Sequence, residues 1–299
     1  MPELQLQTHH LQGAAGPHLL ITGGVHGDEF EPMVAIRRLR NLISPEQLRG
    51  RVTLVPVVNE PAFRRGERTA EDGLDLARTC PGRADGTVTE QIACALSRLI
   101  RSADFYIDLH TGGTRLTVSP LAGYTMHPDP DVLAQQRRMA TAFNLPIVWG
   151  SDPRLNGRSL SVARDAGVPA IYTEYLGGGG CSSEGVAAYV DGCLNVLAVL
   201  EMLDRPQPAS RVQVTVEDDR PNAGFLQLGH PAPKEGCFIP DVKLGDRVQA
   251  GDRLGTLSNL SGTEVVEISA AQSGLVIVLR TFPSVAVGDS LAVVLEHEG

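Results

Sequence analysis

Residues 19–203 alternate between short apolar runs and longer stretches in which apolar residues recur at helical spacing. The runs predict buried strands, and the longer stretches predict helices. The predicted strands are 19–21, 51–58, 105–110 and 170–174, and the predicted helices are 29–42, 88–100, 132–143 and 184–203. Strands that alternate with helices predict an α/β domain of three layers around a largely buried sheet.

The Pro-rich stretch 205–208 ends this alternation. From residue 211 onward the chain shows short Val-rich runs, many Gly turns and no helical pattern. A Pro-rich stretch between two such different regions is typical of a linker. We therefore expect an α/β catalytic domain in residues 1–205 and a small all-β cap domain in residues 211–299.

The cap region contains a repeated segment, because 248–254 (VQAGDRL) recurs as 285–291 (VAVGDSL). A Gly-Asp pair between two apolar runs is typical of a hairpin turn, and its repetition predicts two similar halves packed face to face. The pattern resembles the barrel-sandwich fold of biotinyl and lipoyl domains. Residues 264–266 (EVV), between the two copies, hold no Lys to carry such a cofactor. The resemblance therefore implies a structural domain of this fold that carries no covalently attached cofactor.

Charge and cysteine usage limit the classes of protein. The formal net charge of −9 argues against a nucleic-acid surface, which needs a basic excess. No stretch reaches the roughly 18 apolar residues of a membrane helix, and the first residues do not have the pattern of a secretory signal. The five cysteines show no Cys-x-x-Cys spacing and predict reduced thiols. We expect a cytoplasmic protein that binds neither nucleic acid nor membranes. The sequence leaves open whether the chain forms a homo-oligomer.

His26 and Glu29 lie in the segment 23–29 (GGVHGDE), between a predicted strand and a predicted helix. Loops at strand ends build the binding sites of open α/β sheets. Two side chains three positions apart can face one point, and an imidazole with a carboxylate suits Zn²⁺. His-x-x-Glu also arises by chance, and the structural alternative is a surface His beside a helix N-terminus.

His110 ends the predicted strand 105–110, just before two glycines. Because side chains alternate along a strand, Asp108 and His110 point to the same side. This position predicts a third metal ligand in His110 and an orienting partner in Asp108. The alternative is a histidine whose ring nitrogens bond only to the backbone.

Glu174 ends an apolar strand and is followed by four glycines, at 177–180. Burial of an unpaired carboxylate is costly, so a purely structural role is awkward. A glutamate beside a metal site can accept a proton from water and pass it to the departing nitrogen. The alternative is a glutamate that faces solvent at the strand end.

A basic segment follows the predicted strand 51–58. Four arginines lie in it, at positions 64, 65, 68 and 78. Guanidinium groups can polarise a scissile carbonyl and clamp a carboxylate with two hydrogen bonds. The local charge is close to balanced, so a solvated loop in which these arginines pair with neighbouring acids is the alternative.

Together these motifs resemble the succinylglutamate desuccinylase/aspartoacylase family of the zinc carboxypeptidase superfamily, from about residue 19 to the end. The matching segments are 26–29 (HGDE), 75–78 (DLAR), 108–112 (DLHTG) and 173–174 (TE) with the glycines after it. The resemblance implies a three-layer zinc-carboxypeptidase-like fold with a mixed sheet. It implies that His26, Glu29 and His110 are zinc ligands. It also implies that Glu174 is the catalytic acid and base.

The resemblance extends to the basic segment. Arg68, nine positions after Asn59, matches the arginine that polarises the substrate carbonyl, and Arg78 matches the arginine that binds the substrate carboxylate. Asp75 and Asn59 belong to the same expected substrate-binding set. The family's usual Asp-Leu-Asn-Arg reads Asp-Leu-Ala-Arg here, so Ala77 replaces an amide that would share carboxylate recognition.

The resemblance implies a Zn²⁺-dependent hydrolase that cleaves the amide bond of a small N-acyl amino acid or N-acyl amine. Relatives that handle N-acetyl-diaminobutyrate are part of this group. Two alternatives stay open: a zinc carboxypeptidase that acts on short peptides, and a non-catalytic relative that uses the metal site to bind a ligand.

Overall fold

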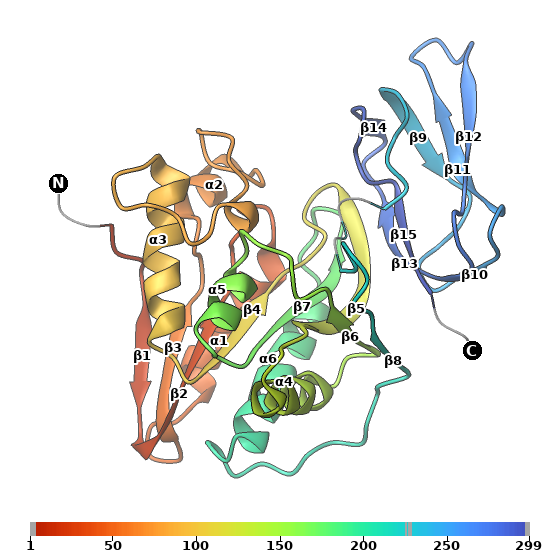
Figure 1. Ribbon diagram of the computed structural model, residues 1–299. Helices are drawn as coiled ribbons and strands as arrows, with labels where there is room; N and C mark the ends of the chain where they lie inside the picture. The colour runs from red at the N-terminus through yellow and green to blue at the C-terminus, as the bar shows by residue number, and fades with distance from the viewer. Residues whose placement is uncertain (1–3, 225, 227–228, 297–299) are drawn as a thin grey trace.

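The structure, a computed structural model, describes residues 4–224, 226 and 229–296. Figure 1 shows an α/β region, with helices on both sides of a central sheet, and a smaller β region toward the C-terminus. The predicted fold class is confirmed, because a three-layer α/β region with a mixed sheet is followed by an additional antiparallel sheet.

The central sheet runs in the order β1-β3-β2-β4-β7-β5. Neighbouring strands from β3 to β7 are parallel, whereas β1 and β5 are antiparallel to their neighbours. The far edge of β5 carries β6, parallel to it, and β6 in turn carries β8. The bounds are β1 His9–Gln12, β2 Ala14–Thr22, β3 Arg49–Val55, β4 Phe105–Leu109, β5 Leu116–Thr125, β6 Ile147–Ser151, β7 Ala170–Gly177 and β8 Val214–Glu217.

Helices cover both faces of this sheet (Figure 1). The helices α1 (Phe30–Leu42), α4 (Pro130–Phe143) and α6 (Ser183–Val199) pack on one face. The helices α3 (Val88–Arg101) and α5 (Ser159–Asp165) pack on the other face. The sheet is therefore buried on both sides, which is why its parallel strands read as nearly continuous apolar runs. Two short helices, α2 (Glu60–Arg65) and η1 (Leu76–Arg78), lie in the basic segment.

Besides the edge strand β1, two strands of the sheet, β5 and β6, lie where the sequence predicted none. Pro120 and Gly123 lie within β5, and Gly150 lies within β6. Proline and glycine are disfavoured inside strands, so the local pattern did not indicate a strand in either place. Both strands form because each has neighbours to pair with: β5 pairs with β7 over 117–123, and β6 pairs with β5 over 147–151.

The C-terminal region is all β among its described residues. One sheet has the order β12-β11-β9-β14, and the strands β10, β13 and β15 pair with one another around β13. The strand β13 also pairs with β5, and β8 pairs with β6, so hydrogen bonds join the two regions. The division into 1–205 and 211–299 remains a prediction about folding units. The bounds are β9 Gly236–Pro240, β10 Arg247–Val248, β11 Arg253–Ser258, β12 Val265–Ser269, β13 Gly274–Arg280, β14 Ser284–Val285 and β15 Ala292–Leu295.

The repeated Gly-Asp segments form the same turn in both copies. Asp252 accepts a hydrogen bond from the backbone N–H of Gln249 (2.7 Å), and Asp289 accepts one from that of Ala286 (3.0 Å). The hairpin expectation is wrong, however, because the strands flanking each turn lie in different sheets. Each turn carries the chain from one sheet to the other across the apolar interior between them. The packing of two layers face to face agrees with the expected scaffold.

No described helix is both long enough and apolar enough to cross a membrane. All five cysteines are free thiols in this structure.

Candidate metal centre and substrate cavity

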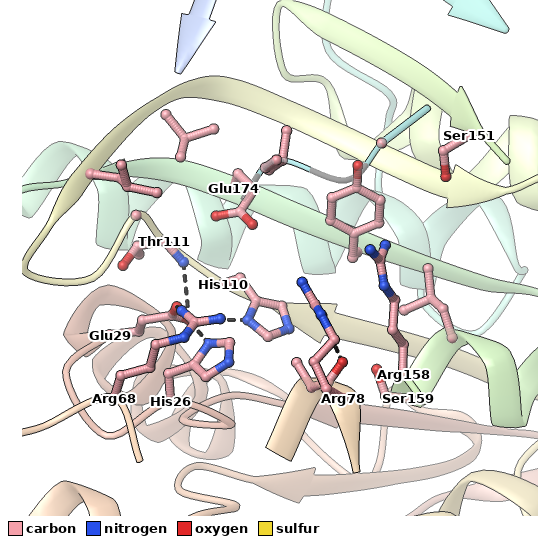
Figure 2. Close-up of a pocket in the computed structure, with 18 of the residues that line it drawn as sticks. His26, Glu29, Arg68, Arg78, His110, Thr111, Ser151, Arg158, Ser159 and Glu174 are labelled. Atoms are coloured by element: carbon pink, nitrogen blue, oxygen red, sulfur yellow. Dashed lines mark hydrogen bonds and ion pairs between the residues drawn. The ribbon is translucent and has the colours of Figure 1, made fainter. Parts of the chain in front are cut away.

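Two histidines and one glutamate meet at the carboxyl ends of β2 and β4. His26 and Glu29 come from the loop between β2 and α1, and His110 follows β4 directly. One nitrogen or oxygen atom of each side chain lies within 4.8 Å of the others. Figure 2 shows the three side chains pointing toward one another at one end of a cavity. We call these residues the His-Glu-His cluster.

The carboxylate of Glu29 is the centre of this cluster. Its two oxygens lie 2.8 Å from Nδ1 of His26 and 3.1 Å from Nδ1 of His110, and one of them accepts the backbone N–H of Thr111. Burial alone would raise the pKa of Glu29, but the two imidazoles hold it well below its usual range. The cluster thus presents a carboxylate and two imidazole Nδ1 atoms to one point, a donor set that suits a divalent metal ion.

The second nitrogen of each histidine faces a further carboxylate. Nε2 of His26 lies 3.0 Å from Asp75, and Nε2 of His110 lies 3.2 Å from the fully buried Asp108. Asp108 also accepts hydrogen bonds from Thr22 (2.8 Å) and from Ser159. Such carboxylate partners orient metal-binding imidazoles and fix which nitrogen faces the ion. The geometry around the cluster therefore fits the chemistry of a bound cation.

Glu174 lies on β7 and lines the same cavity as the cluster. Its Oε2 atom is buried and has no hydrogen-bond partner among the described residues. Burial raises the pKa of Glu174 to about 8, because the charged form is poorly solvated there. Figure 2 shows this carboxylate facing the cluster from the other side of the cavity. A carboxylate in this position can exchange protons with molecules held in the cavity.

The basic segment divides into exposed and cavity-facing arginines. Arg64 and Arg65 form exposed ion pairs with Glu60 (2.5 Å) and Glu67 (2.6 Å). Arg64 and Arg65 therefore match the alternative of a solvated loop in which arginines pair with neighbouring acids. Arg68 instead lines the cavity and pairs with Asp75 at 3.0 Å, with its Nη1 atom 3.8 Å from Glu29.

Arg78 and Arg158 form a second positive group in the cavity, which we call the arginine pair. Burial and the nearby charge of Arg158 lower the pKa of Arg78 to about 10. Figure 2 shows both guanidinium groups at the part of the cavity away from Glu29. Guanidinium groups bind carboxylates through charge-assisted hydrogen bonds, often two at once. Two of them lining one cavity are therefore suited to a carboxylate.

Sequence reasoning missed Arg158. This residue is the N-cap of the short helix α5, close behind β6, a strand that the sequence did not indicate. Without that strand, the segment had no predicted place in the sheet. The signal that could have found it is an arginine directly before a helix start in an α/β region, where loops at sheet ends build sites.

Two expected substrate-binding residues lie beside the cavity and do not line it. Asn59 is fully buried and caps α2 by accepting the backbone N–H of Ala62 at 3.2 Å. Asp75 bridges His26 and Arg68 and also caps η1 through the backbone N–H of Ala77 at 2.9 Å. In this structure both residues hold neighbouring groups in position.

The fold and cavity define a class: an α/β protein in which strand ends bring a His-Glu-His donor set, a further glutamate and several arginines into one cavity. The sequence profile of the succinylglutamate desuccinylase/aspartoacylase catalytic domain matches residues 15–200. The chain therefore belongs to this family, and the family expected from the motifs is confirmed.

Individual proteins that resemble this chain belong to the same family. The N-alpha-acetyl-L-2,4-diaminobutyric acid deacetylase of Halomonas elongata is 35% identical, over 94% of this chain and 82% of that protein. The product-bound structure of the ectoine utilization protein EutE (DoeB) from Ruegeria pomeroyi has 33% identity and a TM-score of 0.86, covering 96% of this chain and 87% of the other. A succinylglutamate desuccinylase/aspartoacylase structure from Rhodobacter sphaeroides has 29% identity and a TM-score of 0.86, covering 97% and 89%. These relatives support hydrolase activity of the deacylase type.

Proposed function

We propose that this chain is a zinc-dependent deacylase that hydrolyses the amide bond of a small N-acyl amino acid. The observation that carries the proposal is the unpartnered, buried carboxylate oxygen of Glu174 in the same cavity as the His-Glu-His cluster. A buried charge without a partner is costly, and it is kept where its chemistry is used.

Zinc is the metal that the donor set fits best. Two imidazole nitrogens and one carboxylate are a common set of three protein ligands for catalytic Zn²⁺. When bound there, Zn²⁺ supplies Lewis acidity, which makes water acidic near neutral pH and polarises a carbonyl oxygen. In this proposal His26, Glu29 and His110 hold the ion, and their partners Asp75 and Asp108 orient the imidazoles.

Glu174 moves the proton in the proposed reaction. Its carboxylate accepts a proton from the attacking water and then donates that proton to the amine nitrogen as the amide bond breaks. The positive charge of a neighbouring cation favours the ionised form that this first step needs. The guanidinium of Arg68 stabilises negative charge on the carbonyl oxygen, because Arg68 lies beside the cluster and lines the same cavity.

The arginine pair binds the substrate carboxylate in this proposal. Ala77 lines the cavity but offers no amide group, and the second guanidinium, from Arg158, supplies donors at this end of the cavity. The arginine pair and the His-Glu-His cluster line the same cavity, at opposite ends of it (Figure 2). An N-acyl amino acid with a free carboxylate therefore fits, and N-acetyl-2,4-diaminobutyrate is the first compound to test because of the Halomonas relative.

The proposal is tested by metal analysis together with a hydrolysis screen. Purified protein should hold about one zinc per chain and release amine from at least one acetyl, succinyl or other acyl amino acid. Glu174→Gln should lower kcat by about 10²- to 10⁴-fold and leave the zinc content unchanged. The matched control is Glu184→Gln, because Glu184 is exposed at the start of α6.

Three outcomes would count against this function. Full activity in Glu174→Gln removes Glu174 from the reaction. Faster release of C-terminal residues from short peptides than of any acyl group favours the carboxypeptidase alternative. Bound zinc with no hydrolysis of any amide in the screen favours the non-catalytic alternative.

A further inference from the structure

We propose that Tyr172, Thr125 and Ser151 form a subsite that binds a hydrogen-bond donor at the end of the substrate's side chain. We call these three residues the hydroxyl subsite. The donor would be a hydroxyl or carboxamide group on the amine half of the substrate, because the guanidinium of Arg158 in the same cavity disfavours a cation. This inference rests on the proposed deacylase function and names the side-chain class that the same cavity selects.

The position of Tyr172 points to this role. It lies on β7 two residues before Glu174, so both side chains leave the strand on the same face. Two strand residues span about 7 Å, which places Tyr172 one short side chain away from the reacting amide. Tyr172 lines the cavity, and its hydroxyl is buried with no hydrogen-bond partner among the described residues. Buried tyrosine hydroxyls normally have a partner, so a ligand can supply the missing one.

The neighbouring strand makes room for this ring. Gly123 on β5 pairs with Tyr172. A Cβ atom at Gly123 would lie 2.3 Å from Cε1 of Tyr172 and 2.6 Å from its hydroxyl oxygen. Only glycine therefore leaves room for the phenol at this point, which is two residues before the paired ends of β5 and β6.

Two further hydroxyls lie at those strand ends. Thr125 ends β5 and Ser151 ends β6, and the two residues pair in register. Both are buried, at 4% and 2% exposure, and both line the cavity. The hydroxyl of Ser151 donates its proton to the backbone carbonyl of Tyr124 (3.1 Å), so it offers only lone pairs to a ligand. Figure 2 shows Ser151 at the end of the cavity opposite His26 and Glu29.

The chemistry of this end of the cavity selects the ligand group. Among the described lining residues the only carboxylates are Glu29 and Glu174, which serve the metal and the proton transfer in the proposed function. The hydroxyl subsite therefore offers neutral oxygens to its ligand. The charge of Arg158 reaches the Tyr172 hydroxyl, so a neutral donor fits this subsite better than an ammonium group. Since Ser151 can only accept, a group with N–H or O–H protons satisfies the subsite and a methyl group does not.

The test compares two nearly isosteric substrates, N-acetyl-homoserine and N-acetyl-norvaline. Their side chains differ mainly in ending with a hydroxyl or a methyl group. Wild-type protein should prefer the hydroxyl substrate by at least about tenfold in kcat/KM. Tyr172→Phe should reduce that preference by about tenfold through a higher KM for the hydroxyl substrate, with norvaline hydrolysis unchanged. Because the hydroxyl has no partner, this variant should keep the wild-type melting temperature.

The matched control is Tyr175→Phe. Tyr175 packs on the opposite side of β7 against Tyr189, with ring centroids 6.0 Å apart. This variant should keep the wild-type preference. An equal loss on both substrates in Tyr172→Phe would mean that the ring only supports the cavity, and an unchanged preference would remove the hydroxyl from recognition. Either result overturns the inference.

A failure of the proposed function gives a different result. Wild-type protein would then hydrolyse neither compound, and the subsite is tested by calorimetry with free homoserine and norvaline. Tighter binding of homoserine in wild type, lost in Tyr172→Phe and kept in Tyr175→Phe, supports the subsite without any turnover. Equal binding of the two amino acids by wild type overturns it.

Discussion

The α/β region and the C-terminal β region use side-chain carboxylates over very different distances along the chain. In the β region Asp252 and Asp289 each bond to a backbone N–H three residues earlier. In the α/β region Glu29 meets His110 across 81 positions, and Asp75 meets His26 across 49. The turns of the β region follow from a few adjacent residues. The site of the α/β region exists only once the strands are in register.

The two regions nevertheless share one apolar cluster. Ile277 and Val278 of β13 pack with Val118 and Leu121 of β5 and with Trp149 of β6. This contact, together with the pairing of β13 and β5, indicates that the C-terminal region stabilises the wall of the cavity. The comparison therefore separates two kinds of effect: loss of chemistry, which arises from long-range contacts, and loss of stability, which arises in both regions.

The largest effect is expected from His26→Ala, which removes a donor of the His-Glu-His cluster. Loss of even an outer partner of a metal ligand costs about 10- to 100-fold in metal affinity or activity, so loss of the ligand itself should exceed a hundredfold. Metal analysis and kcat/KM measure the outcome. His9→Ala is the control, since His9 lies on the edge strand β1, away from the cavity. Retention of stoichiometric zinc and activity would contradict the site.

A large stability effect is expected at the junction. Ile277 is fully buried, and Ile277→Ala should lower the free energy of unfolding by about 2–5 kcal/mol. Urea unfolding followed by far-UV circular dichroism and by fluorescence of Trp149, the single tryptophan, should give one shared transition. Val287→Ala is the control because Val287 is 69% exposed. Two separate transitions in wild type would show that the regions fold independently.

A smaller effect is expected from Asp108→Asn. The amide keeps the size of the carboxylate but removes the charge that faces Nε2 of His110. Zinc affinity should fall by about 10- to 100-fold, measured by competition with a chelator. Asp165→Asn on the exposed end of α5 should leave affinity unchanged. Unchanged affinity in Asp108→Asn would mean that Asp108 only supports the packing of Thr22 and Ser159.

The smallest effect is expected from the first Gly-Asp turn. Asp252→Ala should cost about 1 kcal/mol of stability, because it removes one side-chain hydrogen bond to the backbone. Asp289→Ala should cost more, because Asp289 also forms an ion pair with the buried Arg280 (2.9 Å). Because the turns lie away from the cavity, kcat/KM should stay at the wild-type value. A fall in activity with either variant would show that the β region influences the reaction directly.

Much of the α/β fold was predictable from residues 19–203, where apolar periodicity indicated most helices and the strands β2, β3, β4 and β7. The residues of the His-Glu-His cluster were also predictable, because they follow two of those strands. Glu174 was predictable as well, although it lies inside β7, which continues to Gly177. Arg158 and Ser151 were not, because they depend on β5 and β6, strands that form through pairing with neighbours in spite of their proline and glycine residues. Tyr172 lies on a predicted strand, but its place beside Gly123 also depends on β5.

The sequence by itself determined which side chains can bind a metal ion, which faces of the strands they occupy, and where the Gly-Asp turns fall. These features follow from residue chemistry and from contacts a few positions apart. The tertiary structure decided that Asp75 holds His26, that Asn59 caps a helix outside the cavity, and that a second arginine joins Arg78. These contacts join residues whose distance in space is set by sheet register and helix packing, which local sequence does not specify.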